Sequence, residues 1–529
     1  MPYLKLKVCN WGVATSEVIG LLSEFAERGF INAGEVLYYQ LLYRTAGANP
    51  HDVVFGKAFV YSEAFISLIL AHSKNPAAPS LPEVREILNA IPGLADAYEL
   101  DVKGEDWKLS LKAPLLNRDF HPSDWTAHDW ELFFDMGSDD LHFLSWPGSQ
   151  FHRLIGSFAM LNGDRTEAEI YDSWGGDTRY LDYFLGFVAA AGLLLRSEHP
   201  FQSPAEEHAP AAGIELLCHS SLRIRQGSDH ILVDPVLLVP PPLNRTPAYA
   251  ERFDRLTSQF AGVTGVMISH HHWDHLNLQT LARIPRHIPI YIPPHTKTSR
   301  NTGCNPDIAA FLASIGFTKI VPLEWNSEHP VGDTRVTGLP FYGEWFGPDS
   351  AFDGCTFLAA INSKRMLATV DADRDERGDM QDVFERFASS NSPTVDYLFF
   401  CCTGQQHRCP TFCGAPFTFS NTYGRDLAAR MRYHPDREVV ARWCGTLKPR
   451  YIIPYAEFIF HNESVARPPL ALNETVSTDQ WFQSYWNSSL KSKDEWIARW
   501  KTDLEALQEQ VNQFGTKIVM LAPGEMLIA

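Results

Sequence analysis

The feature that most constrains this chain is a short run of metal-binding side chains in its second half. Read with gaps, the run is His270-x-His272-x-Asp274-His275. The apolar residues 263–268 before it predict a strand, and residues 276–284 after it predict a short helix. The motif therefore lies on a strand-to-helix loop. Three imidazoles and one carboxylate so close together supply much of the ligand set of a two-metal site.

Length, charge and cysteine content restrict the class of protein. The chain has 529 residues, more than one ordinary core accommodates, so two domains are predicted. Its net charge of −18 disfavours a nucleic-acid partner, because binding a phosphate backbone requires a positively charged surface. The longest apolar run, residues 183–195, is too short for a membrane span, and no signal-peptide pattern opens the chain. Nine sparsely spread cysteines are typical of a reduced cytoplasmic protein.

A predicted linker divides the chain. Residues 198–212 are rich in Pro, Ala and Glu and show no periodicity. We therefore expect an N-terminal domain at residues 1–210 and a second domain at residues 213–529. The first has helical patterns at about residues 14–29 and 33–46 and carries no metal motif, so we expect a mostly helical (α+β) domain. Two capping boxes, Ser80-x-x-Glu83 and Thr166-x-x-Glu169, predict helix starts.

Strand and helix patterns alternate through the second domain. Strands are expected at residues 289–294, 331–341, 365–370, 397–402 and 451–455, and helices at about 422–443 and 492–513. A loop rich in Cys, Gly and Pro is expected at residues 403–420. This alternation predicts an α/β fold.

The motif and its flanks resemble the metallo-β-lactamase superfamily. His-x-His-x-Asp-His after a strand is similar to the metal motif of that fold. Residues 213–235 resemble its opening hairpin, and residues 517–525 resemble its closing strand. The resemblance covers about residues 213–529 and implies an αββα sandwich. Because the superfamily includes hydrolases, nucleases, lactonases and diiron oxygenases, the fold does not decide the reaction.

The resemblance implies three further ligands for a two-metal site. A bridging carboxylate is expected directly after a strand, where Asp371 stands, and Asp373 is the alternative. In hydrolases of this fold another strand ends in a histidine ligand, but this chain has Glu344 there. His329 precedes that strand and is more typical of a surface residue. A glutamate adds a hard, negatively charged oxygen donor, which suits iron better than a His-dominated zinc pair.

The last ligand is expected after the strand that ends at about residue 455. His461 is the first histidine beyond it and is our predicted ligand. His407 and His434, from the preceding loop and helix, remain alternatives.

Glu344, the metal motif and the long N-terminal region together resemble the metallo-β-lactamase-fold diiron oxygenases, the family of the β-hydroxylase of chloramphenicol biosynthesis. Such enzymes use O2 and two iron ions to hydroxylate an amino acid held as a thioester on a nonribosomal peptide synthetase carrier domain. By resemblance, the first iron would bind His270, His272 and Glu344, the second would bind Asp274, His275 and His461, and Asp371 would bridge them. The resemblance also gives Glu344 and Asp371 catalytic importance.

The resemblance implies a diiron monooxygenase of specialised metabolism that acts on a free or carrier-tethered substrate. Its electrons would come from an external reductase, because the chain shows no flavin or nicotinamide fingerprint. The N-terminal domain is expected to form a homodimer contact or to dock a carrier protein. The alternative is a two-metal zinc hydrolase acting on an ester, lactone or phosphodiester. A binding protein with a degenerate site is the third hypothesis.

Overall fold

The structure is a computed structural model. It describes residues 1–7, 10–14, 80–90, 95, 98–111, 130–135, 141–201, 212–237, 260–272, 275–295, 307–344, 351–390, 395–401, 418–420, 434–456, 493–521 and 524–528. Among the predicted site residues and their alternatives, Asp274, His407 and His461 lie outside this set. The two predicted N-terminal helices also lie outside it, beyond Ala14.

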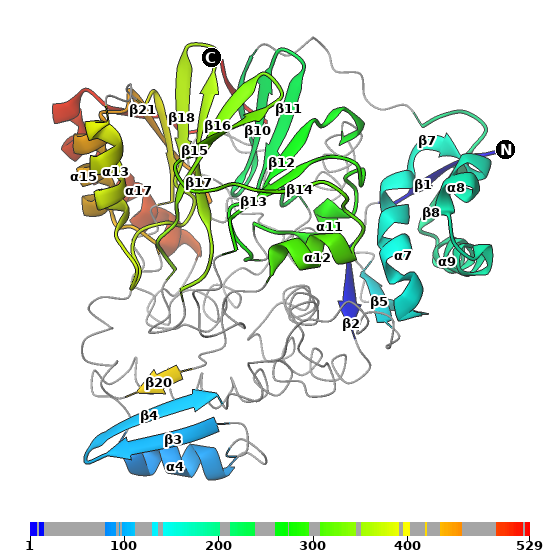
Figure 1. Ribbon diagram of the computed structural model, residues 1–529, viewed down its shortest axis with the longest axis horizontal. Coiled ribbons are helices and arrows are strands. Elements are labelled where there is room, and N and C mark those ends of the chain that lie inside the picture. Colours follow the sequence, from blue (N-terminus) through cyan, green and yellow to red (C-terminus); the bar gives the residue numbers. More distant parts are fainter. Residues whose placement is uncertain are drawn as a thin grey trace.

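Two seven-stranded mixed sheets form the body of the C-terminal part (Figure 1). The first contains β9 (Gly213–Cys218), β10 (Ser221–Gln226), β11 (Asp229–Val233), β12 (Gly265–Met267), β13 (Ile290–Ile292), β14 (Ile320–Pro322) and β23 (Met526–Ile528). The second contains β15 (Ser327–Val331), β16 (Thr334–Pro340), β17 (Cys355–Ile361), β18 (Lys364–Ala368), β19 (Tyr397–Phe400), β21 (Tyr451–Pro454) and β22 (Lys517–Ile518). Their orders are β14-β13-β12-β11-β10-β9-β23 and β15-β16-β17-β18-β19-β21-β22. The predicted α/β class is confirmed.

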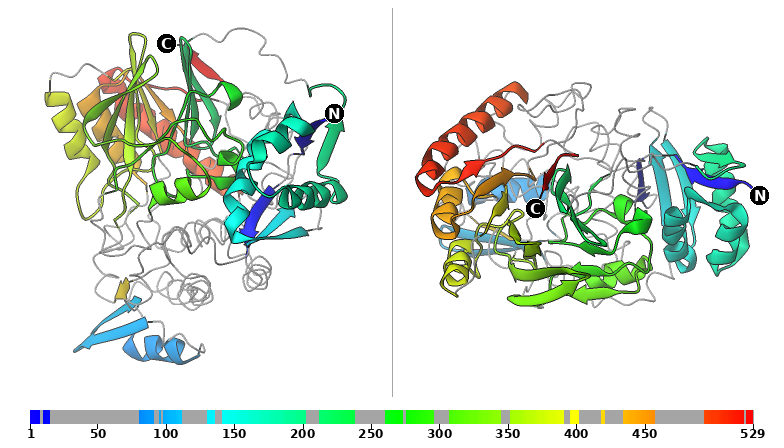
Figure 2. Two further views of the ribbon diagram at one scale, coloured as in Figure 1. Left: turned by 45° about the vertical axis from the view of Figure 1, so that its right-hand side comes forward. Right: turned by 90° about the horizontal axis from the view of Figure 1, so that it is seen from above.

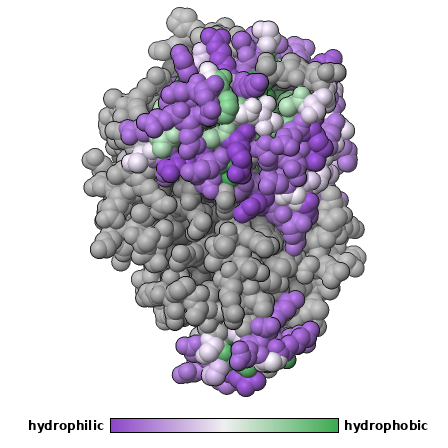
Figure 3. All heavy atoms as spheres, turned by 90° about the vertical axis from the view of Figure 1, so that its left-hand side faces the viewer, coloured by the Kyte–Doolittle hydropathy of each residue, from purple (hydrophilic) through white to green (hydrophobic). Residues whose placement is uncertain are grey.

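Helices accompany both sheets. Beside the first lie α11 (Leu278–Leu281), α12 (Ile308–Ser314) and the short 3-10 helix η3 (Phe260–Gly262). The second sheet is covered by α13 (Met380–Ser389), α15 (Arg437–Leu447) and α17 (Lys493–Val511), which is followed by η4 (Asn512–Phe514). On the side of α13, α15 and α17, most described surface residues are hydrophilic and the apolar patches are small (Figure 3).

Alternation along the strands explains how the second sheet buries both faces. On β19, Tyr397 and Phe399 belong to the core between the two sheets, whereas Leu398 and Phe400 belong to the core under α13, α15 and α17. Successive side chains of a strand point to opposite faces, so an unbroken apolar run fills both cores. Each fully buried side chain of this size contributes about 1.5–3 kcal/mol. The strand ends are thereby fixed in position.

The described N-terminal part contains strands as well as helices. Its strands are β1 (Tyr3–Leu6), β2 (Asn10–Ala14), β3 (Tyr98–Lys103), β4 (Asp106–Leu111), β5 (Trp130–Asp135), β6 (Leu141–Trp146), β7 (Asn162–Thr166) and β8 (Leu194–Ser197). Its helices are α4 (Leu81–Ala90), α7 (Gly148–Met160), α8 (Glu167–Trp174) and α9 (Thr178–Ala190). Together with β20 (Thr418–Ser420), which comes from later in the chain, these strands form sheets ordered β7-β1-β8, β2-β5-β6 and β20-β4-β3.

Both predicted helix starts are confirmed. Glu83 accepts hydrogen bonds from the backbone and side chain of Ser80, directly before α4. Thr166 and Glu169 form a reciprocal capping box at α8.

The predicted loop at residues 403–420 contributes a strand to the N-terminal part. β20 (Thr418–Ser420) pairs antiparallel with β4, with Thr418 opposite Ser110 (Figure 1). Local sequence does not reveal such a pairing, because its hydrogen bonds join segments that are distant along the chain. The domain boundary at residues 198–212 stays a prediction.

A part-buried guanidinium joins α7 to the segment that follows the metal motif. In both views of Figure 2 the cyan helices of the N-terminal part lie on the side of the green elements of the first sheet. Arg286 donates to the carbonyl of Ile155 in α7 at 2.9 Å and to that of Leu281 in α11 at 2.9 Å. Its guanidinium also stacks over the ring of Phe317, 4.4 Å from the centroid. Arg286 also donates to the carbonyls of Ala282 and Ile284, both at 3.0 Å, at the C-terminal end of α11, where carbonyls lack a partner within the helix.

In the described part of the chain, no helix is long and apolar enough to cross a bilayer. The described cysteines Cys218, Cys355, Cys401 and Cys444 are all buried free thiols.

Arg286→Ala is expected to lower the free energy of unfolding by about 3 kcal/mol, because several buried carbonyls lose a charged donor. The measurement is the midpoint of urea unfolding. Arg335→Ala is the matched control, since Arg335 is exposed and its ion pair among the described residues is with exposed Glu328 at 2.6 Å. That pair contributes about 0–1 kcal/mol. Equal midpoints for the two variants would show that Arg286 does not hold the two segments together.

Candidate metal centre

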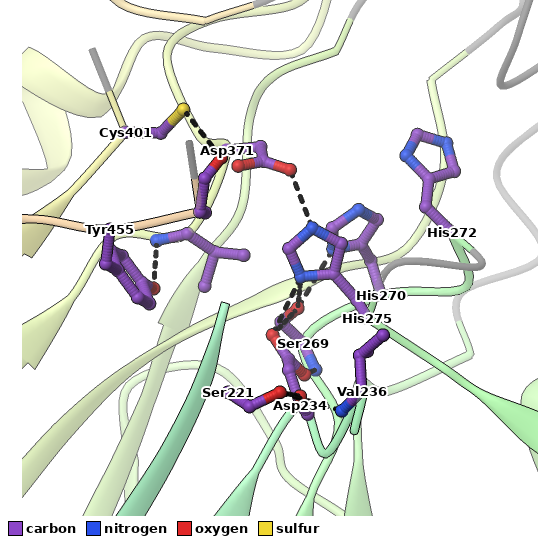
Figure 4. Close-up of polar contacts among 12 residues, drawn as sticks. Ser221, Asp234, Val236, Ser269, His270, His272, His275, Asp371, Cys401 and Tyr455 are labelled. Atoms are coloured by element: carbon purple, nitrogen blue, oxygen red, sulfur yellow. Dashed lines mark hydrogen bonds and ion pairs between the residues drawn. The ribbon is translucent and has the colours of Figure 1, made fainter. Parts of the chain in front are cut away.

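The metal-binding side chains collect where strands of both sheets end. The motif loop follows β12, Glu344 follows β16, and Asp371 follows β18. Strands β16 and β18 run in the same direction because each is antiparallel to β17. Their carboxyl ends therefore meet at one edge, where Figure 4 shows His275 pointing toward Asp371, with His270 beside His275.

One half of the site consists of two imidazoles around a glutamate. The Nε2 atom of His270 lies 3.1 Å from Oε2 of Glu344, and the Nδ1 atom of His272 contacts the same oxygen. All three side chains are buried. Glu344 has φ = 46°, in the left-handed region that non-glycine residues rarely adopt. The surrounding structure therefore holds this carboxylate in a strained backbone conformation.

The other half is built on Asp371. Its Oδ2 atom lies 2.8 Å from Nε2 of His275. The Nε2 atom of His434 lies 3.9 Å from Oδ1 of Asp371 and 3.8 Å from Oε1 of Glu344. Imidazole nitrogens and carboxylate oxygens bind metals at about 2.0–2.2 Å, so donors that share an ion lie within about 4.4 Å of each other. His434 thus meets both halves at a separation that suits shared ions.

The donor atoms form overlapping groups of the size that a metal ion needs. Within 4.8 Å of one another lie the donors of His270, His272 and Glu344, and likewise those of His270, His275 and Asp371. Burial, followed by the neighbouring imidazoles, lowers the pKa of His270 well below its ordinary value, so this ring is neutral. Neutral imidazoles beside buried carboxylates leave negative charge in an apolar surrounding, which a cation offsets. The site fits metal ions.

Comparisons with known proteins agree with this geometry. Residues 229–350 match the model of the beta-lactamase superfamily domain. Over the full length of the chain, the fold is similar to that of CmlA, a diiron β-hydroxylase from Streptomyces venezuelae, with a TM-score of 0.51 and 14% identity over 100% of both chains. A CmlA β-hydroxylase mutant gives a TM-score of 0.52 and 16% identity over 99% of this chain and 100% of the other. The chain has the metallo-β-lactamase fold.

A curated relative matches in sequence over a shorter stretch. It is the 4-amino-L-phenylalanyl-[CmlP-peptidyl-carrier-protein] 3-hydroxylase of Streptomyces venezuelae, 27% identical over 150 residues. The aligned stretch spans 27% of this chain and 27% of that relative.

Of the predicted ligands in this metallo-β-lactamase-fold domain, the structure brings together those that it describes: His270, His272, His275, Glu344 and Asp371. It adds His434, which sequence analysis had only as an alternative to His461. Among the described residues, the groups of donors close enough to hold a metal contain neither Asp373 nor His329. His329 lies in β15 opposite Val336, on the far strand of the second sheet.

A buried carboxylate that sequence analysis missed orients one imidazole of the fold's metal motif. Asp234 follows β11, and its Oδ2 atom lies 3.0 Å from Nδ1 of His275. Ser269 donates to the same carboxylate from its backbone N at 2.7 Å and from its hydroxyl at 2.6 Å (Figure 4). With Nδ1 donating to Asp234, Nε2 of His275 presents its lone pair toward Asp371. The available signal was a carboxylate that directly ends a buried strand, as Asp371 does.

Asp371 is itself positioned by a buried tyrosine. The hydroxyl of Tyr455, which follows β21, accepts a hydrogen bond from the backbone N of Val370 at 3.0 Å. Val370 has φ = 54°, so the turn that presents Asp371 is held in an unfavourable conformation. Burial, followed by the nearby carboxylates of Asp234 and Asp371, raises the pKa of Tyr455 well above its ordinary value. The phenol therefore stays neutral.

Asp234→Asn is expected to weaken metal binding by about 10–100-fold, because His275 loses the acceptor that fixes its ring. Competition with a chelator measures the affinity, and circular dichroism checks the fold. Asp229→Asn is the control, because Asp229 is also buried but accepts from the backbone and hydroxyl of Thr334 at the opposite end of β11. Equal affinities for the two variants would contradict the role of Asp234.

Proposed function

We propose that this protein is a non-heme diiron monooxygenase that hydroxylates an amino acyl group tethered to a carrier protein. The observation that carries the proposal is Glu344, which lies against His270 and His272 at the strand end where hydrolases of the fold have a histidine. With Asp371 close by, the site is rich in hard oxygen donors. Such a donor set favours iron over zinc.

We assign seven ligands to two ions. The first ion would bind His270, His272 and Glu344, the second would bind Asp274, His275 and His434, and Asp371 would bridge. His434 takes the place we expected for His461, because its Nε2 atom faces both carboxylates. The predicted His461 lies outside the described residues.

The protein's own groups provide the setting of the reaction. When bound, two iron ions supply the activation of O2 for insertion into a C–H bond. The rings of Phe341 and Phe352, at 5.1 and 5.5 Å from the ring of His270, keep this side of the site apolar and dry. Asp234 and Tyr455 hold their partners in fixed orientations, so little reorganisation is needed as charge changes at the metals.

The proposed substrate class follows the curated relative, whose name describes hydroxylation of an aminoacyl group on a peptidyl carrier protein. The similarity in fold to CmlA supports this class, since it covers the N-terminal part of the chain in addition to the metal-binding part. We further propose that an external reductase supplies electrons and that the N-terminal part forms a homodimer contact or docks the carrier. We also propose that the N-terminal part is mostly helical. A cytoplasmic location is a further proposal.

The test of the function uses protein expressed with iron present. With a reductant supplied, we expect two iron ions per chain and O2 consumption that depends on an aminoacyl carrier protein, with one oxygen atom of O2 entering the product and the other leaving as water. Elemental analysis and mass spectrometry of the acyl group measure both. Zinc alone, together with turnover of an ester or lactone, would replace the proposal with the hydrolase hypothesis.

In the same assay, Glu344→Ala should lower activity or iron affinity by at least about 10–100-fold. Mutation of residues that only hydrogen-bond to a metal ligand already causes losses of this size. Glu328→Ala on exposed β15 is the control. Full iron content and unchanged O2 consumption in a folded Glu344→Ala variant would remove the basis of the iron assignment.

A separate prediction decides the last ligand. His434→Ala should weaken metal binding by about 10–100-fold or more, because a buried donor facing both carboxylates is lost. His461→Ala should bind metal as the unchanged protein does. Chelator competition on both variants measures this, and the reverse ranking would restore His461 as the ligand.

A further inference from the structure

We propose that Cys401 is a positioning residue that fixes the ring orientation and the tautomer of His434 for metal binding. Cys401 follows β19 and is fully buried. Its Sγ atom lies 3.3 Å from Nδ1 of His434. The inference rests on the proposed function only in requiring a metal at this site, and not on the reaction.

The hydrogen-bond inventory of the thiol determines the tautomer. Cys401 also lies 3.6 Å from the carbonyl oxygen of Ala456, to which its S–H donates (Figure 4). A thiol has one proton, and a carbonyl oxygen can only accept. Both contacts are therefore satisfied together only when Nδ1 of His434 carries its proton and donates to sulfur. The Nε2 atom then carries the lone pair of the ring.

That lone pair has the correct direction for a metal ligand. The Nε2 atom is the one that faces Glu344 at 3.8 Å and Asp371 at 3.9 Å. His275 is held in the same way: its Nδ1 atom is hydrogen-bonded to Asp234, and its Nε2 atom faces Asp371. Metal-binding histidines commonly use their second nitrogen in this way, which fixes both ring orientation and tautomer.

The carbonyl that accepts from the thiol belongs to a residue with a constrained backbone. Ala456 has φ = 57°, and its backbone N donates to the carbonyl of His219 at 3.0 Å, so the acceptor of the thiol is itself fixed.

The competing role for Cys401 is direct ligation. The Sγ atom, a donor of His434 and a donor of Asp371 lie within 4.8 Å of one another. The positioning role is favoured because Sγ lies 3.3 Å from Nδ1 of His434, at hydrogen-bond distance from the proposed metal ligand.

Cobalt binding to the apoprotein tests the proposal independently of activity. Co2+ affinity is measured by chelator competition, and the visible spectrum reports thiolate ligation. Cys401→Ala should weaken Co2+ binding by about 10–100-fold. Cys401→Ser should recover most of the affinity, because a hydroxyl also accepts from Nδ1–H and donates to a carbonyl. Cys444→Ala, which removes a buried thiol from α15, should change nothing.

A double-mutant cycle separates positioning from general loss of structure. If Cys401 acts through His434, Cys401→Ala should have no further effect in a His434→Ala background. Additive losses, or an unchanged affinity in Cys401→Ala, would overturn the proposal. A thiolate-to-cobalt charge-transfer band that disappears in Cys401→Ser would overturn it in favour of direct ligation. If the double-mutant cycle gives the expected Co2+ affinities but the protein does not hydroxylate a carrier-bound substrate, the proposed function is refuted and the role of Cys401 stands.

Discussion

Buried negative charge at one edge of two apolar sheets is the constraint on which this structure depends. Glu344 and Asp371 have almost no access to water, and the imidazoles around them compensate only when a cation is shared. Burial of a carboxylate is unfavourable in free energy, so the packed strands around it must hold it in this position. The strained conformation of Glu344 and the turn before Asp371 are both maintained by the packed strands on either side.

The parts of the site that are encoded locally could be predicted from the sequence. The motif His270–His275 is contiguous, and Glu344 and Asp371 each follow a buried strand, so residue type and position were enough. His434 was not singled out, because its approach depends on how α15 and the segment before it pack against β19. Asp234 was overlooked for a different reason: its role depends on a hydrogen bond to His275, which lies in the loop after another strand.

The fold shows the same division. Alternating strands and the capping boxes at Ser80 and Thr166 were predictable, since their periodicity and hydrogen bonds are local. The strands of the N-terminal part were not, and neither was the pairing of β20 with β4. Contacts of Arg286 and Gln279 with α7 and Trp11 likewise join segments far apart in sequence. Such pairings follow from three-dimensional packing, which a single sequence does not specify.

The pairing of β20 with β4 also affects the order in which the chain can fold during synthesis. Ser110 leaves the ribosome long before Thr418, so the sheet that contains β3 and β4 lacks its third strand until most of the chain has been made. Loop closure over this span is slow compared with local structure formation. The N-terminal part is therefore completed only with the segment between Cys401 and His434. His434, which faces Asp371, comes shortly after β20 in the sequence, so this sheet and the group of side chains around Asp371 both need the same late stretch of the chain.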